Sequence, residues 1–419
     1  MLIRLIIFLM LCCMALPLIA QTDAETEQSS EAGAGAQQKL MRLYIDADNS
    51  ISRNATQSIY RGIYTALQEH DFQLQGYQFE IVIRDHRGNS SRSKVNLKSF
   101  LEDDQGLLVF GGLHSPPLLA NKAFINQQKI LLLDPWAAAA PITRSNGVDN
   151  WIYRLSVDDS KAGEFITAHA VDEEGFRQPY LLLENTGWGR SNEKNMLKAL
   201  ADRGIEVAGI GWFNWSLGKY NAKTMLRQAR QSGADVIFLV ANAPEGKVLL
   251  QAMAEDPSLS LPVRSHWGIT GGDFAIDVSA EARALADLKF IQTRFSFFEL
   301  PRAPLAEQVL QQARINFDGL VSPRDIKAPA GFIHAYDLTR VLIAAIQQAG
   351  LSGDVVTDRA NIRDALNNLQ VSVKGLIKTY KQPFTAYLPQ RPDAHEALGL
   401  SDLRMAYFNQ QGNIILESE

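Results

Sequence analysis

His114 and Ser115 are adjacent in the chain and have the residue types of a general base and a nucleophile. Adjacent side chains generally point apart, so the pair does not place a base beside a hydroxyl nucleophile. The chain also lacks a Gly-x-Ser-x-Gly elbow, and no two carboxylates stand out as an acid and its base. The sequence therefore predicts that the protein is not an enzyme.

Residues 46–50 (DADNS) resemble the opening of a calcium-binding loop. Ile51 stands where that loop requires glycine, however, and Gln57 stands where it requires its last glutamate. The 7 histidines show no metal-ligand spacing, and the Gly111–Gly112 pair is followed by neither lysine nor a third glycine in the register of a phosphate loop. We therefore expect no metal and no cofactor.

Three of the 6 tryptophans, Trp136, Trp188 and Trp267, follow apolar segments that resemble buried strands. Indole rings stack on planar rings, on the apolar faces of sugars and against quaternary amines. The alternative is that these rings fill gaps between loops and sheet. The recurrence at three separate strand ends favours an aromatic-walled pocket.

The elements that position these residues alternate along the chain between short apolar runs and longer amphipathic stretches. The candidate strands are 41–45, 79–84, 106–110, 130–133, 180–184, 206–212, 236–240, 263–265 and 288–292, with 406–408 and 413–416 near the end. The candidate helices are 55–69, 160–174, 191–202, 224–231, 245–254, 335–349 and 359–367. This alternation predicts an α/β fold with parallel sheets.

Two such α/β runs follow each other in the chain, which favours two lobes over one continuous sheet. The two runs cover roughly residues 41–155 and 156–290, and a helical return and a C-terminal tail follow them. Ligands of open parallel sheets bind beyond the carboxyl ends of the strands. The residues that follow each strand are therefore the candidate site residues.

The first 20 residues have the pattern of a cleavable signal peptide: Arg4 precedes an apolar run, and a small residue, Ala20, precedes Gln21. The run is short for a membrane span, which needs about 20 residues. Residues 21–40 are rich in Gln, Glu, Ser, Ala and Gly and predict a flexible leader. Cys12 and Cys13 both lie in the signal, so we expect a periplasmic mature chain without thiols.

The net charge of −5 does not indicate a basic surface that would bind nucleic acid or an anionic membrane. We expect neither partner. The composition, with 46% hydrophobic and 21% charged residues, is ordinary globular material.

Several segments, in this order, resemble the type I periplasmic binding proteins, and in particular the leucine/isoleucine/valine-binding proteins of ABC transporters. They are 107–115 (LLVFGGLHS), 130–136 (ILLLDPW), 151–154 (WIYR), 158–160 (DDS), 180–184 (YLLLE), 187–189 (GWG), 233–238 (GADVIF) and 334–339 (HAYDLT). The resemblance implies two doubly wound parallel-sheet lobes that are joined by three hinge crossings and close on a small molecule. The resemblance places these crossings near 154–157, 292–295 and 369–374. It thereby implies that residues 41–155 plus 293–371 form the first lobe and that residues 156–292 plus 372–419 form the second.

The resemblance also implies a site for the ligand carboxylate on two turns of the first lobe. His114 and Ser115 keep the polarity of the first turn, whereas Ala138 stands where the family's second turn has a hydroxyl residue. Trp136 adds a large ring to that second turn, and Asp134 either caps the loop or contacts a cationic ligand.

In the second lobe, Trp267 stands where the family has an acid that neutralises the ligand ammonium. Trp188 and Asn242 stand at two further positions that are aromatic in the family. Burying an ammonium without a counter-charge costs several kcal/mol, so we expect aliphatic amino acids to bind poorly. The expected ligand has a ring or another flat apolar body and a carboxylate or amide end near Ser115.

Two functions remain open at this point. A monomeric protein of this kind either delivers its ligand to an ABC permease or acts as a periplasmic sensor for a membrane kinase or chemoreceptor. A repressor is excluded by the export signal and by the absence of a helix-turn-helix before Met41. Import is the leading hypothesis.

Overall fold

The computed structural model describes residues 39–144 and 149–418. The expected signal peptide, its two cysteines and nearly all of the expected leader lie outside the described residues. Within the described residues, no helix is long and apolar enough to cross a membrane.

Lobe 1 is built on a six-stranded sheet with the strand order β2-β3-β1-β4-β5-β6. Its strands are β1 (Lys39–Ala47), β2 (Gln73–Leu74), β3 (Tyr77–Asp85), β4 (Gly106–Gly111), β5 (Leu132–Asp134) and β6 (Ile152–Arg154). Its helices are α1 (Arg53–Gln68), α2 (Ser90–Leu101), α3 (Ser115–Gln127), α10 (Pro304–Asn316), α11 (Pro329–Ala349) and α12 (Val355–Asn367), with short 3-10 turns η1 (Ala140–Ile142) and η5 (Pro323–Asp325). All neighbours from β3 to β6 pair in parallel, and only β2 is antiparallel.

Lobe 2 is built on a seven-stranded sheet with the order β15-β14-β11-β10-β9-β7-β8. Its strands are β7 (Pro179–Glu184), β8 (Gly209–Phe213), β9 (Val236–Val240), β10 (Val263–Ser265), β11 (Leu288–Thr293), β14 (Leu403–Phe408) and β15 (Ile414–Leu416). Its helices are α4 (Asp159–Thr167), which continues as the π-helical η2 (Ala168–Glu173), α5 (Gly187–Ala201), α6 (Lys219–Gln231), α7 (Ala243–Glu255), α8 (Phe274–Asp277) and α9 (Ala280–Leu285), with 3-10 turns η3 (Pro257–Leu259), η4 (Trp267–Thr270) and η6 (Leu400–Asp402). The strands from β8 to β11 are parallel, while β14 and β15 add an antiparallel edge.

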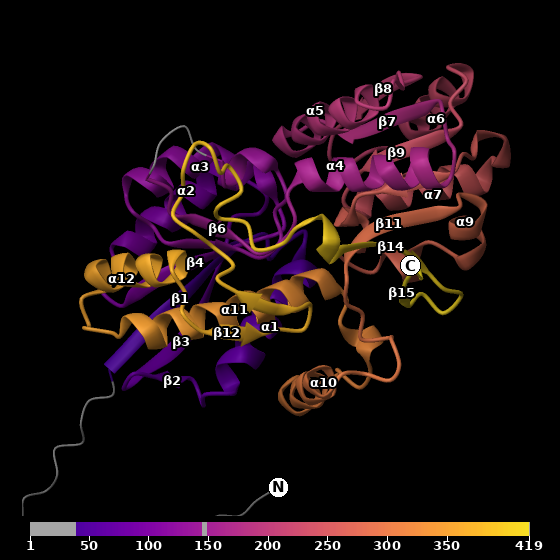
Figure 1. The fold of residues 1–419 in the computed structure, drawn as a ribbon. Helices are drawn as coiled ribbons and strands as arrows, with labels where there is room; N and C mark the ends of the chain where they lie inside the picture. Colours follow the sequence, from indigo (N-terminus) through magenta and orange to yellow (C-terminus); the bar gives the residue numbers. More distant parts are fainter. Residues whose placement is uncertain (1–38, 145–148, 419) are drawn as a thin grey trace, which may run out of the picture. The chain divides into compact units, whose positions relative to one another are not determined.

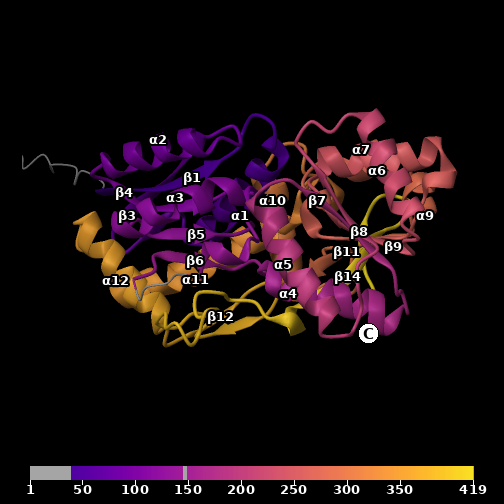
Figure 2. The same ribbon diagram turned by 90° about the horizontal axis from the view of Figure 1, so that it is seen from above.

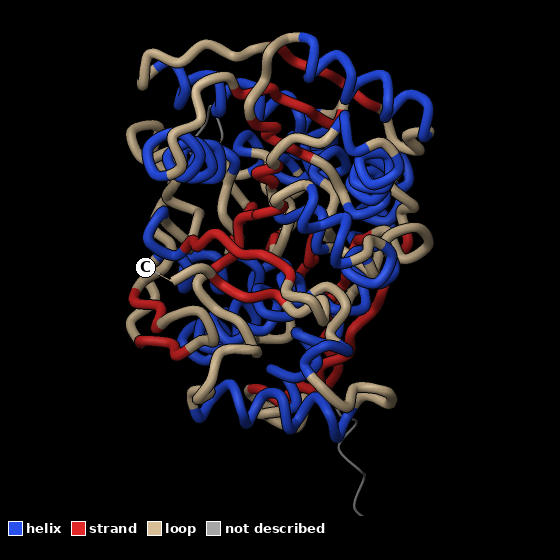
Figure 3. The backbone as a smooth tube through the Cα atoms, turned by 90° about the vertical axis from the view of Figure 1, so that its right-hand side faces the viewer, coloured by secondary structure: helices blue, strands red, loops and turns tan. Residues whose placement is uncertain are grey.

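The central strands of both sheets are buried along their whole length because helices cover both of their faces. Every residue of β4, β7 and β9 is buried, as expected for strands inside a doubly wound sheet. Figure 1 shows these strands between layers of helices, and Figure 3 shows the strands of the structure as red segments among blue helices. The predicted α/β fold is confirmed.

The late helices return to lobe 1. Helix α11 packs along α1 and α12 packs against α11 and β4. Most residues of α11 are buried, including Tyr336, whose hydroxyl donates to Glu69 at the end of α1, and Asp337, whose carboxyl accepts from residues 376, 377 and 380. The helices α1, α11 and α12 lie together beside the first sheet in Figures 1 and 2.

The segment from 372 to 398 lies on lobe 1, whereas we expected it in lobe 2. It contains the small hairpin β12 (Ser372–Lys374) and β13 (Thr379–Lys381). Tyr380 Oη donates to Asp337 Oδ2 over 2.8 Å, and the Phe384 ring lies 5.1 Å from the Tyr153 ring. Short strands with buried apolar residues look alike in sequence whichever sheet they join, so the pattern did not reveal their partner.

Three stretches of chain connect the lobes. They are residues 155–158 between β6 and α4, residues 294–303 between β11 and α10, and residues 399–402 before β14. The third crossing therefore comes later than the expected 369–374, because the hairpin and the segment after it pack on lobe 1 first.

Candidate ligand-binding site

Two turns at the carboxyl edge of the first sheet supply one wall of the site. Strand β4 ends at Gly111, and Ser115 begins α3 with His114 in the N-cap position. The neighbouring strand β5 ends at Asp134, and Trp136 and Ala138 follow it. Because β4 and β5 are adjacent and parallel, the two turns meet at one edge of the sheet.

Lobe 2 supplies the opposite wall in the same manner. Strand β7 ends at Glu184 and is followed by Trp188 in the first turn of α5. Strand β9 is followed by Asn242 at the N-cap of α7, and β10 is followed by Trp267 at the start of η4. These three strands are neighbours in the sheet, so their ends also meet.

A cavity of about 270 Å³ lies between these two sets of strand ends. Its lining residues are Leu113, His114, Ser115, Pro116, Trp136, Ala138, Glu184, Trp188, Asn242, Trp267 and Gly268. The structure thus brings together seven of the eight site residues predicted from sequence. Their contact with a ligand stays a prediction.

Asp134 is the eighth predicted residue, and it does not line the cavity. Its Oδ1 accepts the backbone N–H groups of Trp136 at 3.0 Å and Ala137 at 2.8 Å. Burial raises the pKa of this carboxyl to about 7, although the nearby Arg154 guanidinium and the two N–H groups act in the opposite direction. Asp134 therefore fixes the turn that presents Trp136 and Ala138 to the cavity.

Ser115 keeps a hydrogen-bond donor available in the wall of lobe 1. Its Oγ accepts the Ala139 backbone N–H over 3.2 Å. No acceptor for the hydroxyl proton of Ser115 is found within residues 39–144 and 149–418. The hydroxyl can therefore donate to an acceptor on a bound molecule.

The three predicted tryptophans are packed tightly around the cavity. Trp136 and Trp267 are each 1% exposed and Trp188 is 6% exposed. A Cβ on Gly331 would lie 2.5 Å from Trp136 Cζ3, and a Cβ on Gly268 would lie 2.7 Å from Trp188 Cη2. Glycine at these two positions lets the backbone approach each indole closely, so the rings form fixed walls.

Two of these indoles belong to a row of rings that continues into lobe 1. The indole Nε1 of Trp188 donates to Asp159 Oδ1 over 3.1 Å, and its ring meets the edge of His266 at 5.1 Å. Trp267 lies 5.2 Å from the His266 ring and 5.4 Å from the His334 ring of α11. The row orients both indoles.

His114 faces the cavity but is already held by polar groups of lobe 1. Its Nε2 lies 3.3 Å from Asp48 Oδ2 and 3.1 Å from Ser52 Oγ. Burial opposes ionisation of Asp48, but the hydrogen bonds from His114 and from the Ile51 backbone N–H lower the pKa of Asp48 to about 2. The His114 ring also lies 5.1 Å from Trp215 of lobe 2.

Sequence reasoning missed the acid in the cavity wall. Glu184 was not among the predicted site residues, and neither was Arg190, which pairs with Glu193 at 3.4 Å. Glu184, however, lines the cavity, is 1% exposed and accepts from Asn242 Nδ2 over 2.8 Å. The sequence did contain a signal for this residue: the apolar run 180–183 ends in a single acid, Glu184. Residues at the carboxyl ends of parallel strands face the ligand site, so this acid could have been predicted as a wall residue.

Burial raises the pKa of Glu184, while the hydrogen bonds it accepts act in the opposite direction. No basic side chain of the described residues forms an ion pair with it. The cavity therefore contains a carboxyl group that can accept a hydrogen bond from a bound molecule.

Side chains of the two lobes also touch beside the cavity. Asn54 Nδ2 of α1 donates to Asp273 Oδ2 of lobe 2 over 3.0 Å, and Lys327 lies 3.4 Å from the other oxygen of Asp273. The Ala140 backbone N–H donates to Ser191 Oγ of α5 over 3.0 Å. These contacts hold the two walls of the cavity together.

Solved structures share the arrangement of the whole described chain. A solute-binding protein of an ABC transporter from Rhodopseudomonas palustris, in complex with p-hydroxybenzoic acid, aligns with a TM-score of 0.74 at 16% identity over 91% of this chain and 96% of its own. A type 1 periplasmic binding protein from Bordetella pertussis aligns with a TM-score of 0.72 at 14% identity over 91% and 100% of the two chains. A leucine-binding protein from Thermotoga maritima aligns with a TM-score of 0.68 at 14% identity over 90% and 98%.

Identities this low show a common fold and leave the ligand of this chain undetermined. None of the curated proteins compared with the chain matches it in sequence. A family model described as periplasmic binding protein matches residues 49–386, which is most of the chain. Its members bind solutes and are not enzymes. Together with the two-lobed fold, this match shows that the chain belongs to the periplasmic binding protein family.

Proposed function

We propose that the protein captures a small organic molecule between its lobes in the periplasm and presents it to an ABC permease. The observation that carries this proposal is the cavity whose walls come from strand ends of both lobes. A ligand that touches both walls favours the arrangement in which they meet, since binding shifts a conformational equilibrium toward the state with more contacts. A permease can then distinguish the loaded protein from the empty one.

The cavity limits the size of this ligand. Its volume of about 270 Å³ includes space that is open to solvent, so only a small ligand can be enclosed between the walls. The three indoles leave a narrow apolar space, which suits a flat body. We infer a ligand with a single ring.

The polar groups in the walls define the two ends of the ligand. Ser115 begins α3, where the helix dipole and the Ser115 backbone N–H favour an anionic group, whereas Pro116 and Pro117 have no N–H to donate. Glu184, on the wall of lobe 2, accepts a hydrogen bond and repels a second carboxylate. The preferred ligand therefore carries a carboxylate or amide toward Ser115 and a hydrogen-bond donor, such as a hydroxyl or amine, toward Glu184.

Proteins of the same fold support this class of ligand. Solute-binding proteins from Rhodopseudomonas palustris are described in complex with p-hydroxybenzoic acid, 3,4-dihydroxybenzoic acid and benzoate. The first two ligands have a planar ring with a carboxylate at one end and a hydroxyl opposite. A hydroxybenzoate fits the order of groups from Ser115 to Glu184.

The test is calorimetry of the mature protein with 4-hydroxybenzoate, benzoate, leucine and a neutral sugar, together with mass spectrometry of ligand released from natively purified protein. We expect 4-hydroxybenzoate to bind most tightly and leucine to bind weakly. Tight binding of leucine alone would contradict the proposed ligand class. If the protein binds none of the four and releases no small molecule, the proposal of solute capture is wrong.

The role in import needs a separate measurement. We expect uptake of the bound solute by whole cells to fall when the protein is deleted and to recover when it is restored. Unchanged uptake, with loss of a transcriptional response to the solute, would instead identify a sensor.

A further inference from the structure

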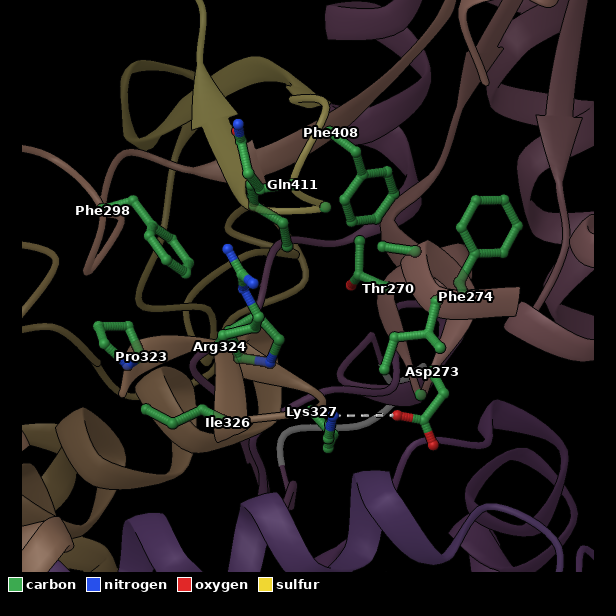
Figure 4. A pocket seen from close by; sticks show the side chains of 16 residues that line it. Thr270, Asp273, Phe274, Phe298, Pro323, Arg324, Ile326, Lys327, Phe408 and Gln411 are labelled. Carbon is green, nitrogen blue, oxygen red and sulfur yellow. Dashed lines mark ion pairs between the residues drawn. The ribbon is translucent and has the colours of Figure 1, made fainter. Parts of the chain in front are cut away.

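A second cavity, of about 560 Å³, lies apart from the cavity between the strand ends. Three segments line it: 270–276 around α8, 298 together with 323–329 in the connection from β11 to α11, and 408–414 in the turn between β14 and β15. None of the residues that line the first cavity lines this one. Figure 4 shows its side chains from close by.

Phenyl rings form much of the wall of this cavity. Phe274 and Phe408 stack with their centroids 5.7 Å apart and their planes at 26°. The guanidinium of Arg283 lies 5.7 Å from the Phe408 ring. Phe298 faces these rings from the connection after β11, as Figure 4 shows. The wall therefore presents aromatic surface on two sides.

The turn between β14 and β15 is fixed against α8. Gly412 has a φ of 80°, which only glycine adopts freely. A Cβ at this position would lie 3.1 Å from the Cβ of Ala275. The cavity is thus bounded by packed backbone and is not a gap beside a loose loop.

The cavity carries a net positive charge. Lys327 is balanced by Asp273 at 3.4 Å, and Asp273 also accepts from Asn54. Arg324 uses its Nε to donate to Asn413 Oδ1 over 3.1 Å, and its two terminal nitrogens have no acceptor among the described residues. Figure 4 shows this guanidinium extending between Phe298 and the side of the cavity that holds Phe408.

We propose that this cavity is a second binding site, which takes a small aromatic carboxylate. The terminal nitrogens of Arg324 bind the carboxylate through charge-assisted hydrogen bonds, and the ring stacks against Phe298 and Phe408. The site is independent of the proposed cleft ligand because it uses other residues. The walls of the second site come from lobe 2 and from the connection between β11 and α11. A ligand bound there therefore contacts lobe 2 and this connection at the same time.

The test is ¹⁹F NMR with 4-fluorobenzoate on the mature protein, comparing the natural sequence with Arg324→Gln and with Arg314→Gln. Arg314 is an exposed arginine of α10 outside the cavity and serves as the matched control. We expect a resonance from bound 4-fluorobenzoate. The apparent affinity that it reports should fall at least about tenfold in Arg324→Gln, because this change removes a charge-assisted hydrogen bond, and should stay unchanged in Arg314→Gln. Both variants should keep the melting temperature of the natural protein.

Binding at the first cavity gives a separate resonance that responds to Ser115→Ala and not to Arg324→Gln, because Ser115 lies on the wall that takes the carboxylate. Absence of any resonance that responds to Arg324→Gln would overturn the second site, whatever happens at the first. An equal loss of affinity in Arg324→Gln and Arg314→Gln would also overturn the second site. The anion would then be attracted by the overall charge of the protein and would not be bound in the cavity.

Discussion

Glu184 and Asn242 follow neighbouring strands of lobe 2 and share a hydrogen bond, in which Asn242 Nδ2 donates to Glu184 Oε2 over 2.8 Å. The bond orients a buried carboxyl in the cavity wall and leaves it able to accept from a ligand. We expect Glu184→Gln to weaken binding of 4-hydroxybenzoate by about 10- to 100-fold, since a hydrogen bond to a charged group contributes about 1.5–3 kcal/mol.

Calorimetry with benzoate provides the comparison, because benzoate has no hydroxyl for Glu184. Its affinity should change little in Glu184→Gln. Glu193→Gln, at a partly exposed acid of α5 that pairs with Arg190, is the control variant and should bind both compounds normally. An equal loss for both compounds would show that Glu184 supports the wall without contacting the hydroxyl.

Trp267 contributes to the stability of the fold and also lines the cavity. It is 1% exposed and packs between the rings of His266 and His334. We expect Trp267→Ala to lower the free energy of unfolding by about 3–5 kcal/mol, as is usual for removal of a buried tryptophan. Urea unfolding followed by circular dichroism measures this change.

Trp215→Ala is the matched comparison, because Trp215 is 37% exposed. It should cost clearly less stability. Similar losses for both variants would mean that Trp267 is not part of the packed row of rings. A large loss of stability in Trp267→Ala would also mean that this variant cannot be used to measure the contact between Trp267 and the ligand, because binding would be lost through unfolding.

Much of the site was predictable because parallel strands bring their carboxyl ends to one edge of a sheet. Runs such as 236–240 identify buried strands, and the residues after them meet once the strands are adjacent. Trp136, Trp188 and Trp267 line one cavity for this reason. Glu184 was missed as a wall residue because sequence alone does not show which way the last residue of a strand points.

The features that the sequence did not predict correctly depend on contacts that the local sequence pattern does not show. Asp337 of α11 accepts the backbone N–H groups of Leu376 at 2.6 Å and Ile377 at 3.0 Å, and this holds the hairpin of residues 372–381 on lobe 1. Nothing in the local pattern of 372–381 indicates that partner. Asp134 is similar: whether its carboxyl turns to its own loop or to the cavity is decided by the backbone N–H groups that follow it.

The contact between Asn54 and Asp273 should contribute to ligand affinity, although neither residue lines the first cavity. Removing it with Asn54→Ala destabilises the arrangement in which the two walls meet, so a smaller fraction of the protein is competent to bind. We expect the apparent Kd for 4-hydroxybenzoate to rise about 3- to 10-fold, the equivalent of one hydrogen bond. The melting temperature of the empty protein should change little.

Asn185→Ala is the control for this prediction, because Asn185 donates to Asn214 Oδ1 over 3.0 Å within lobe 2. Calorimetry should show normal affinity in that variant. If Asn54→Ala binds as tightly as the natural protein, the contact does not contribute to closure.

His169 makes stability depend on pH above neutrality. Its Nε2 lies 2.9 Å from Glu417 Oε2 and its Nδ1 lies 3.3 Å from Glu174 Oε2. Burial alone would lower the pKa of His169, but the two carboxylates raise it to about 9. Arg264 and Lys289 also contact Glu174, so its carboxylate stays ionised and available to the imidazolium.

The unfolded-state pKa of histidine is about 6.5, so the folded state holds the proton more tightly. The resulting stabilisation is fully present below about pH 6.5 and is lost as the pH rises toward 9, through the folded-state pKa. The difference between a pKa of about 9 and one of about 6.5 corresponds to at most about 3.4 kcal/mol, and partial screening by solvent reduces the stabilisation to the order of 2–3 kcal/mol. We expect His169→Gln to be less stable than the natural protein at pH 6 and nearly equal to it near pH 9.5. Urea unfolding of both proteins at several pH values checks this, since the difference between them removes the contribution of other titrating groups. A constant difference across the range would show that His169 stabilises the fold by packing and not through its charge.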